Sequence, residues 1–125
     1  PAYRAGPSNT ATAHDLARLM SALMNGRAVG PEADASMIEI LLDHRHNEMI
    51  PAGLPTGARV AHKTGWITRI HHDAAIVYPE PSATLQTPYV LVILTEGIGG
   101  YDASAALGAS IAGAVTAAFR PTTPS

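Results

Sequence analysis

Cysteine is absent from the 125 residues, and lysine occurs once, as Lys63. Without cysteine the chain has no disulfide framework, no thiolate zinc site and no cysteine nucleophile. Ten acidic residues against eight basic ones give a formal net charge of −2, which excludes the strongly basic surface of a typical nucleic-acid binder. The longest apolar runs, within 89–94 and around Ile111, are far shorter than the roughly 20 residues that cross a bilayer. We therefore expect no nucleic-acid partner and no membrane span.

What the chain does contain is the composition of one globular domain. Hydrophobic residues make up 46% of it and charged residues 14%, and its length suits a single core. We therefore treat residues 1–125 as one unit. The first residue is proline, and the first ten residues lack the basic and apolar regions of a signal peptide. We expect a processed or truncated chain, with any export signal upstream of residue 1.

Two helices are expected in the first third of the chain. Apolar residues at helical spacing predict the first over about 13–25, with Thr12 and Asp15 forming a capping box at its start. Pro31 predicts the first turn of a second helix over about 31–46.

The remainder of the chain predicts three strands and a final helix. The strands are expected over about 58–64, 72–78 and 89–95, and the third has apolar residues at both parities, so both of its faces should be covered. An alanine-rich helix is expected over about 102–119, with small residues that allow close packing on a sheet. Its large apolar residues, expected to pack in the core, are Leu107, Ile111, Val115 and Phe119.

The order of these elements predicts an α+β fold whose strands form an antiparallel meander flanked by helices. Three strands are few for a strand buried on both faces. We therefore expect a further strand, from outside this chain, to pair with the third.

The residues with the most specific pattern are Lys63, Thr64 and Gly65, which are expected to end the first strand. K-T-G is the third sequence element of serine β-lactamases and penicillin-binding proteins, beside S-x-x-K and S-D-N. An amide substrate that bears a carboxylate can lie along a strand edge, and glycine permits that close approach. The Thr64 hydroxyl can donate to the carboxylate, while Lys63 supplies a fixed positive charge.

The similarity extends well beyond the motif. Over about residues 8–119 the sequence resembles the C-terminal half of a class A β-lactamase or a close penicillin-recognising relative. The runs that carry this resemblance are NTATAHDLARLMSALMNG, PEADASMIEILLDH, IPAGLPTGARVAHKTGW, HDAAIVYPE and PYVLVILTEG. The resemblance implies a β-lactamase/transpeptidase-like fold in which N-terminal strands complete the sheet, and an active site between the sheet and an all-helical domain.

The resemblance also implies roles for residues near the motif. The backbone N–H of Trp66 falls where the family places one of its two oxyanion-hole donors. In the family a basic residue of the neighbouring strand often helps to hold the substrate carboxylate, and Arg69, His71 and His72 are all candidates. Each could instead belong to a solvated loop, and His72 with Asp73 could form a structural hydrogen bond. The Trp66 indole would either wall the mouth of a cleft or be a core or rim residue.

Histidine is frequent, with six residues, but its spacing does not indicate a metal site. His44 and His46 are two residues apart on the expected second helix and should point in different directions. His71 and His72 are adjacent on a strand and should face opposite sides of the sheet. We expect no metal and no cofactor.

The catalytic residues of the family are missing from this sequence. Lys63 is the only lysine, and Val60 stands where a Ser-x-x-Lys element would need its serine. No Ser-x-Asn triplet occurs, and no glutamate precedes Glu32. We therefore expect an N-terminal segment of the same protein to carry Ser-x-x-Lys, and the 125 residues alone to be inactive.

The leading hypothesis is a part of an exported serine hydrolase that acylates and hydrolyses β-lactam amides. A first alternative is a penicillin-binding relative, similar to D-alanyl-D-alanine peptidases, with a peptidoglycan-like substrate. A second is a noncatalytic domain that retains only a carboxylate-binding edge. By the same resemblance the protein is expected in the periplasm, outside the cell or in the cell envelope.

Overall fold

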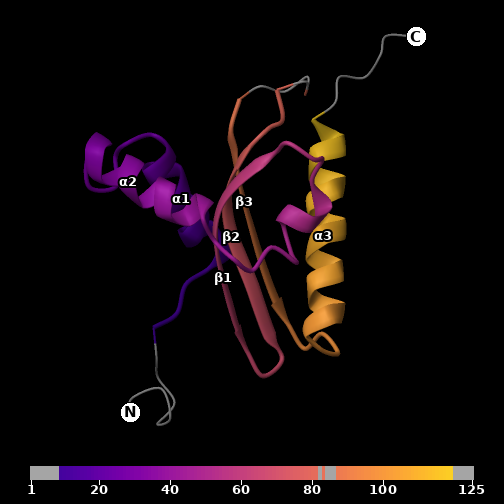
Figure 1. Ribbon diagram of the computed structural model, residues 1–125. Helices are drawn as coiled ribbons and strands as arrows, with labels where there is room; N and C mark the ends of the chain where they lie inside the picture. The colour runs from indigo at the N-terminus through magenta and orange to yellow at the C-terminus, as the bar shows by residue number, and fades with distance from the viewer. Residues whose placement is uncertain (1–8, 82, 84–86, 120–125) are drawn as a thin grey trace.

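The computed structural model describes residues 9–81, 83 and 87–119, and in these a three-stranded antiparallel sheet carries helices on both faces (Figure 1). The sheet order is β1-β2-β3. The predicted α+β class is confirmed. The elements in chain order are α1 (Ala13–Met24), α2 (Pro31–Leu42), the 3₁₀ helix η2 (Pro51–Gly53), β1 (Arg59–Ile67), β2 (Ile70–Tyr78), β3 (Tyr89–Glu96) and α3 (Tyr101–Ala118).

Three of the predicted element bounds differ from the structure by two or more residues: the end of α2, the end of β1, and the start of β2, which is Ile70 and not His72. α2 ends at Leu42, four residues earlier than predicted, because the following residues leave the helix to bond to the sheet, as described below. β1 does not end with the K-T-G motif but continues to Ile67 and pairs in register with β2 from Ile70 onwards. The tight turn between the two strands is closed by Arg69, which adopts a left-handed conformation with φ 63°.

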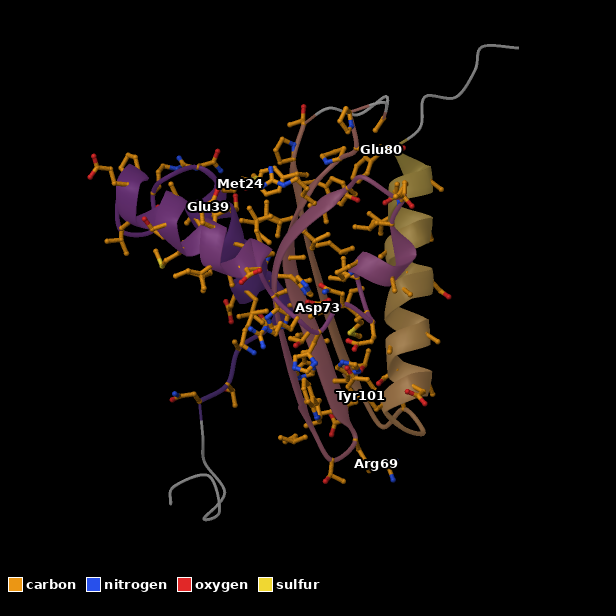
Figure 2. All side chains as sticks on the ribbon, in the orientation of Figure 1. Met24, Glu39, Arg69, Asp73, Glu80 and Tyr101 are labelled. Carbon is orange, nitrogen blue, oxygen red and sulfur yellow. The ribbon has the colours of Figure 1, made fainter. Side chains whose placement is uncertain are left out.

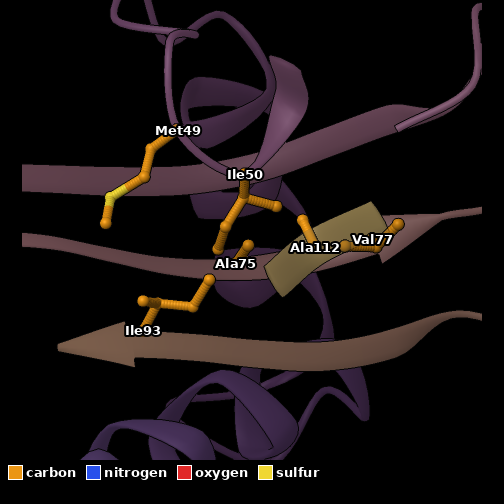
Figure 3. Packing of buried hydrophobic residues seen from close by; sticks show 6 residues of the cluster. All are labelled: Met49, Ile50, Ala75, Val77, Ile93 and Ala112. Atoms are coloured by element: carbon orange, nitrogen blue, oxygen red, sulfur yellow. The ribbon is translucent and has the colours of Figure 1, made fainter. Parts of the chain in front are cut away.

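The helices divide between the two faces of the sheet, with α1 and α2 on one side and α3 on the other (Figure 1). On the α1–α2 face, buried Met20 and Leu23 pack against Ala61 and Ile76. On the α3 face, the loop residues Met49 and Ile50 pack with β2, β3 and α3. Figure 3 shows this second cluster, which consists of Met49, Ile50, Ala75, Val77, Ile93 and Ala112.

α1 begins as its sequence predicts. The Thr12 side chain accepts from the Asp15 N–H at 3.0 Å, and the Asp15 carboxylate accepts from the Thr12 N–H at 3.0 Å. Leu19, part of the same apolar pattern, is 51% exposed. The apolar stripe of α1 is therefore wider than the surface that it buries on the sheet.

α3 packs through its small residues. Ala105, Gly108 and Ala112 are buried, whereas Leu107 is 39% and Phe119 45% exposed. The expectation that these two large side chains pack in the core is wrong, because a helix that lies close to a sheet has room only for small side chains at the contact.

The closest approach of α3 is to η2, and it gives a test of the fold. A Cβ built on Gly53 would lie 1.9 Å from the carbonyl oxygen of Ala109, a backbone atom that cannot move independently of α3. We expect Gly53→Ala to lower the free energy of unfolding by about 3 kcal/mol, as overpacking against backbone does. Gly99→Ala is the matched control, because a Cβ there meets nothing within 4 Å. Urea denaturation of both variants measures the difference, and equal stabilities would contradict the η2–α3 contact.

β3 has both faces covered, as predicted. Ile93, Tyr89 and Leu91 join the cluster on the α3 side, and Val90 joins the cluster on the α1–α2 side. Within the described residues β3 pairs only with β2. Pairing of its other edge with a strand from outside the chain stays a prediction. Among the described helices, none combines the length and apolarity needed to cross a membrane.

Candidate functional site

The K-T-G motif lies on an edge of the sheet. β1 pairs with β2 along one side, and no described strand pairs with its other side. Lys63 and Gly65 are exposed, and a Cβ built on Gly65 would meet no atom within 4 Å. The Lys63 ammonium donates to the carbonyl oxygen of Thr64. The edge of β1 beside Gly65 therefore pairs with no described strand, and the space next to the Gly65 Cα is free of other described atoms.

The register of β1 and β2 decides which candidate residues share a face. Thr64 pairs with Asp73, and Trp66 pairs with His71. Opposed residues of an antiparallel pair lie on the same face, so Thr64, Trp66 and His71 share the face covered by α3. His72 pairs with Gly65 and belongs to the opposite face. His71 and His72 thus face opposite sides of the sheet, as predicted.

Thr64 is buried beneath a histidine. Its exposed fraction is 3%, and its Oγ1 lies 2.8 Å from Nε2 of His44. The backbone N–H of Thr64 also points at this nitrogen, at 3.4 Å. His44 reaches Thr64 because α2 has already ended, so it lies in a loop.

This placement overturns the prediction that His44 and His46 point in different directions from a helix. Both follow the end of α2, and their rings meet edge to face with centroids 5.7 Å apart. His46 also contacts the Trp66 indole at 4.7 Å. These ring contacts could not be predicted from sequence spacing, because they depend on the residue at which α2 ends.

A buried polar network lies directly beside the motif. His62 is 1% exposed and Asp73 is fully buried, and Nδ1 of His62 lies 2.8 Å from Oδ1 of Asp73. The other Asp73 oxygen accepts from the Ile50 N–H at 3.1 Å. On its far side, Nε2 of His62 lies 2.9 Å from Oδ1 of Asn47. Figure 2 shows Asp73 midway along the sheet.

The hydrogen bonds around His62 identify the acceptor beside each of its ring nitrogens. Asn47 turns its Oδ1 to His62 because its Nδ2 donates to the His44 carbonyl, at 3.1 Å. The ring therefore has an oxygen acceptor beside each of its two nitrogens. The sequence left open a structural hydrogen bond between His72 and Asp73; in the structure Asp73 bonds to His62 and Ile50, and Nδ1 of His72 accepts from the Thr95 N–H at 3.1 Å. The available signal was strand parity, since His62 and Asp73 share a face once the hairpin register is known.

A cavity of about 310 Å³ lies between the β1–β2 turn and the start of α3. Its lining includes Trp66, Arg69, His71, Tyr101 and Ser104. The rings of His71 and Tyr101 stack at 4.5 Å, and Nδ1 of His71 lies 2.7 Å from the Ser104 hydroxyl oxygen. In Figure 2 Tyr101 and Arg69 both lie toward the turn end of the sheet. Of the three candidate carboxylate partners, Arg69 and His71 therefore reach this cavity, and His72 is not among its lining residues.

The described residues contain no group of three or more His, Asp or Glu side chains placed to hold a metal ion.

The family described as Beta-lactamase enzyme family matches residues 1–119, and the chain belongs to that family.

Solved structures place the chain among the relatives of class A β-lactamases. It is similar to PBP-A, with 30% identity and a TM-score of 0.78, over 90% of this chain and 41% of PBP-A. It is similar to a β-lactamase from Sphaerobacter thermophilus, with 28% identity and a TM-score of 0.78, over 93% of this chain and 44% of that enzyme. A mutant of the class A β-lactamase of the last common ancestor of Gram-negative bacteria is 30% identical, with a TM-score of 0.73, over 84% of this chain and 39% of that protein.

The chain thus spans about two fifths of the length of each of these structures. A comparison with curated protein sequences found no match.

Proposed function

We propose that this chain forms the K-T-G wall of a serine acyl-transfer site that binds β-lactam amides. The observation that carries the proposal is the open edge of β1 at Gly65, with Lys63 exposed beside it. A β-lactam presents an amide and a carboxylate, and both can be bound along such an edge by backbone and side-chain donors. A point mutant of PBP-A, 29% identical to this chain, has been solved as an acyl-enzyme complex with penicillin G, which supports this substrate class.

Each residue of the motif has a separate role in the proposal. Lys63 provides positive potential for the substrate carboxylate and for the attacking serine. Gly65 leaves space for the substrate to approach the backbone, and the N–H of Trp66 donates to the developing oxyanion. The Thr64 hydroxyl donates to the carboxylate when it is not engaged by His44.

For the second carboxylate donor, the register favours His71 over Arg69 and His72. His71 lies on the same face as Thr64 and Trp66. Its Nδ1 is fixed by Ser104 at 2.7 Å, so the orientation of the ring is set before a ligand arrives. Arg69 belongs to the turn and extends the positive charge along the cavity.

The nucleophile must come from outside these residues. The chain contains no Ser-x-x-Lys and spans about two fifths of its solved relatives. We propose that an N-terminal segment of the same protein supplies it, that the protein acts outside the cytoplasm as a β-lactamase or a penicillin-binding peptidase, and that the 125 residues alone are inactive.

A second candidate is a noncatalytic domain that binds carboxylates. The observation that favours it is the His44–Thr64 contact, which occupies the hydroxyl that the catalytic site would use.

Denaturing intact-mass spectrometry after exposure to benzylpenicillin tests both candidates. We expect the protein to gain the mass of one benzylpenicillin on a segment that carries Ser-x-x-Lys, and none within residues 1–125. Noncovalent binding without any adduct would instead support the carboxylate-binding domain. An adduct on a residue of these 125 would contradict the proposed division of the site.

A further inference from the structure

The Thr64 hydroxyl has a partner that the sequence pattern did not indicate. Its oxygen lies 2.8 Å from Nε2 of His44, and the Thr64 N–H approaches the same nitrogen at 3.4 Å. An N–H can only donate, so Nε2 is the acceptor in that contact. A nitrogen that accepts from the amide also accepts from the hydroxyl. A neutral imidazole has one donor and one acceptor nitrogen, so its proton lies on Nδ1.

The surroundings of His44 keep its ring neutral. Burial lowers the pKa of His44, and electrostatic interaction with His62 and Lys63 lowers it further. The Asp73 carboxylate on β2 raises the pKa of His44, but by less than His62 or Lys63 lowers it, and His46 from the same loop lowers it by the smallest amount. At neutral pH Nε2 of the ring therefore accepts a hydrogen bond from the Thr64 hydroxyl.

We propose that His44 is a positioning residue that decides where the Thr64 hydroxyl points. Nε2 of the neutral ring accepts a hydrogen bond from the Thr64 hydroxyl, so the hydroxyl is not free to donate to a ligand. The protonated ring donates from Nε2 to Thr64 Oγ1, so the hydroxyl proton turns outward and can bind a ligand carboxylate. The identity of the ligand rests on the proposed function, whereas the control of the hydroxyl by His44 does not.

The sign of the pH dependence follows from linkage. A bound carboxylate favours the cationic ring, so binding raises the pKa of His44 and takes up a proton. Affinity for the carboxylate then rises as the pH falls through the titration of His44. Below the pKa of the free protein no further gain is expected from this group.

The first test is the tautomer of His44 in the protein without ligand, from long-range ¹H–¹⁵N spectra at neutral pH. We expect the Nδ1–H form, in contrast to the Nε2–H form that predominates in free histidine. Thr64→Val removes the hydroxyl but keeps the backbone N–H, so the share of the Nδ1–H form should fall without the form being lost, and Thr64→Ser, which retains a hydroxyl, should restore that share. An Nε2–H tautomer in the unsubstituted protein would overturn the proposal.

The second test is the pH dependence of benzylpenicillin binding, measured by calorimetry between about pH 8 and about pH 5, the range in which histidine titrates. We expect about tenfold tighter binding at the lower pH, as for a gained hydrogen bond to a charged group. His44→Asn should remove the part of the pH dependence that His44 contributes, and a dependence unchanged in this variant would overturn the proposal. His14→Asn removes an exposed histidine of α1 and should leave the dependence unchanged.

The outcomes separate the two proposals. Binding that is independent of pH in the unsubstituted protein would overturn the role of His44 and leave the proposed function standing. Absence of binding at every pH would overturn the proposed function, and the tautomer measurement would still decide whether His44 controls the Thr64 hydroxyl.

Discussion

Replacing Lys63 with methionine is expected to lower the rate of acylation by benzylpenicillin by about two orders of magnitude. Lys63 is the only lysine of the chain and lies exposed on the open edge of β1. Methionine retains most of the side-chain volume and removes the charge. The loss is of the size found when one preorganised electrostatic group is removed from an active site. The rate is measured by quenching the reaction at intervals and following the acylated fraction by mass spectrometry.

Two further variants make the result specific to the position. Lys63→Arg should also be impaired, because a planar guanidinium does not replace a compact ammonium ion. Arg59→Met removes an exposed positive charge from the start of the same strand and should change the rate less than about twofold, because exposed charges at that distance are screened. Acylation of Lys63→Met at the unsubstituted rate would contradict the assignment of the motif.

Replacing Asp73 with alanine is expected to lower the free energy of unfolding by about 3–5 kcal/mol, because two buried groups would lose their hydrogen-bond partner. Asp73 and His62 are fully buried or nearly so. The substitution would leave the His62 ring without its acceptor at 2.8 Å, and the Ile50 N–H without its acceptor at 3.1 Å. Urea denaturation followed by circular dichroism measures the change.

Asp73→Asn separates the charge from the hydrogen bonds. The introduced amide can still accept from Ile50 and can donate to Nδ1 of a neutral His62, so we expect a smaller loss than for alanine. Asp43→Asn is the control, because Asp43 is an exposed residue at the end of α2. Equal losses for alanine and asparagine at position 73 would show that the charge alone matters.

The fold could largely be predicted because it follows from local patterns. The capping box of Thr12 and Asp15 and the apolar residues on both faces of β3 are patterns of residues that lie close together in the sequence. The small residues of α3 were recognised for the same reason. The exposure of Leu107 and Phe119 could not be predicted in this way, because it depends on how closely the helix approaches the sheet.

The candidate site could be predicted only in part. K-T-G is a contiguous motif and was found from sequence, whereas the contacts around it join residues 11 to 23 positions apart. The early end of α2 brings His44 to Thr64 and Ile50 to Asp73, and no pattern within α2 indicates that end. The hairpin register was also needed to place His71 with Thr64 and His72 on the other face.

The buried His62–Asp73 pair lies across β1 and β2 on a diagonal, since His62 is opposite Ala75 and Thr64 is opposite Asp73. Side chains alternate along a strand, so sliding β1 by one residue would turn His62 to the other face and break the pair. The same shift in register would move the Lys63 side chain to the face that Thr64 now occupies, and the Thr64 side chain to the opposite face. His62, the residue immediately before K-T-G, therefore stabilises the β1–β2 register in which each residue of the motif lies on its present face of the sheet.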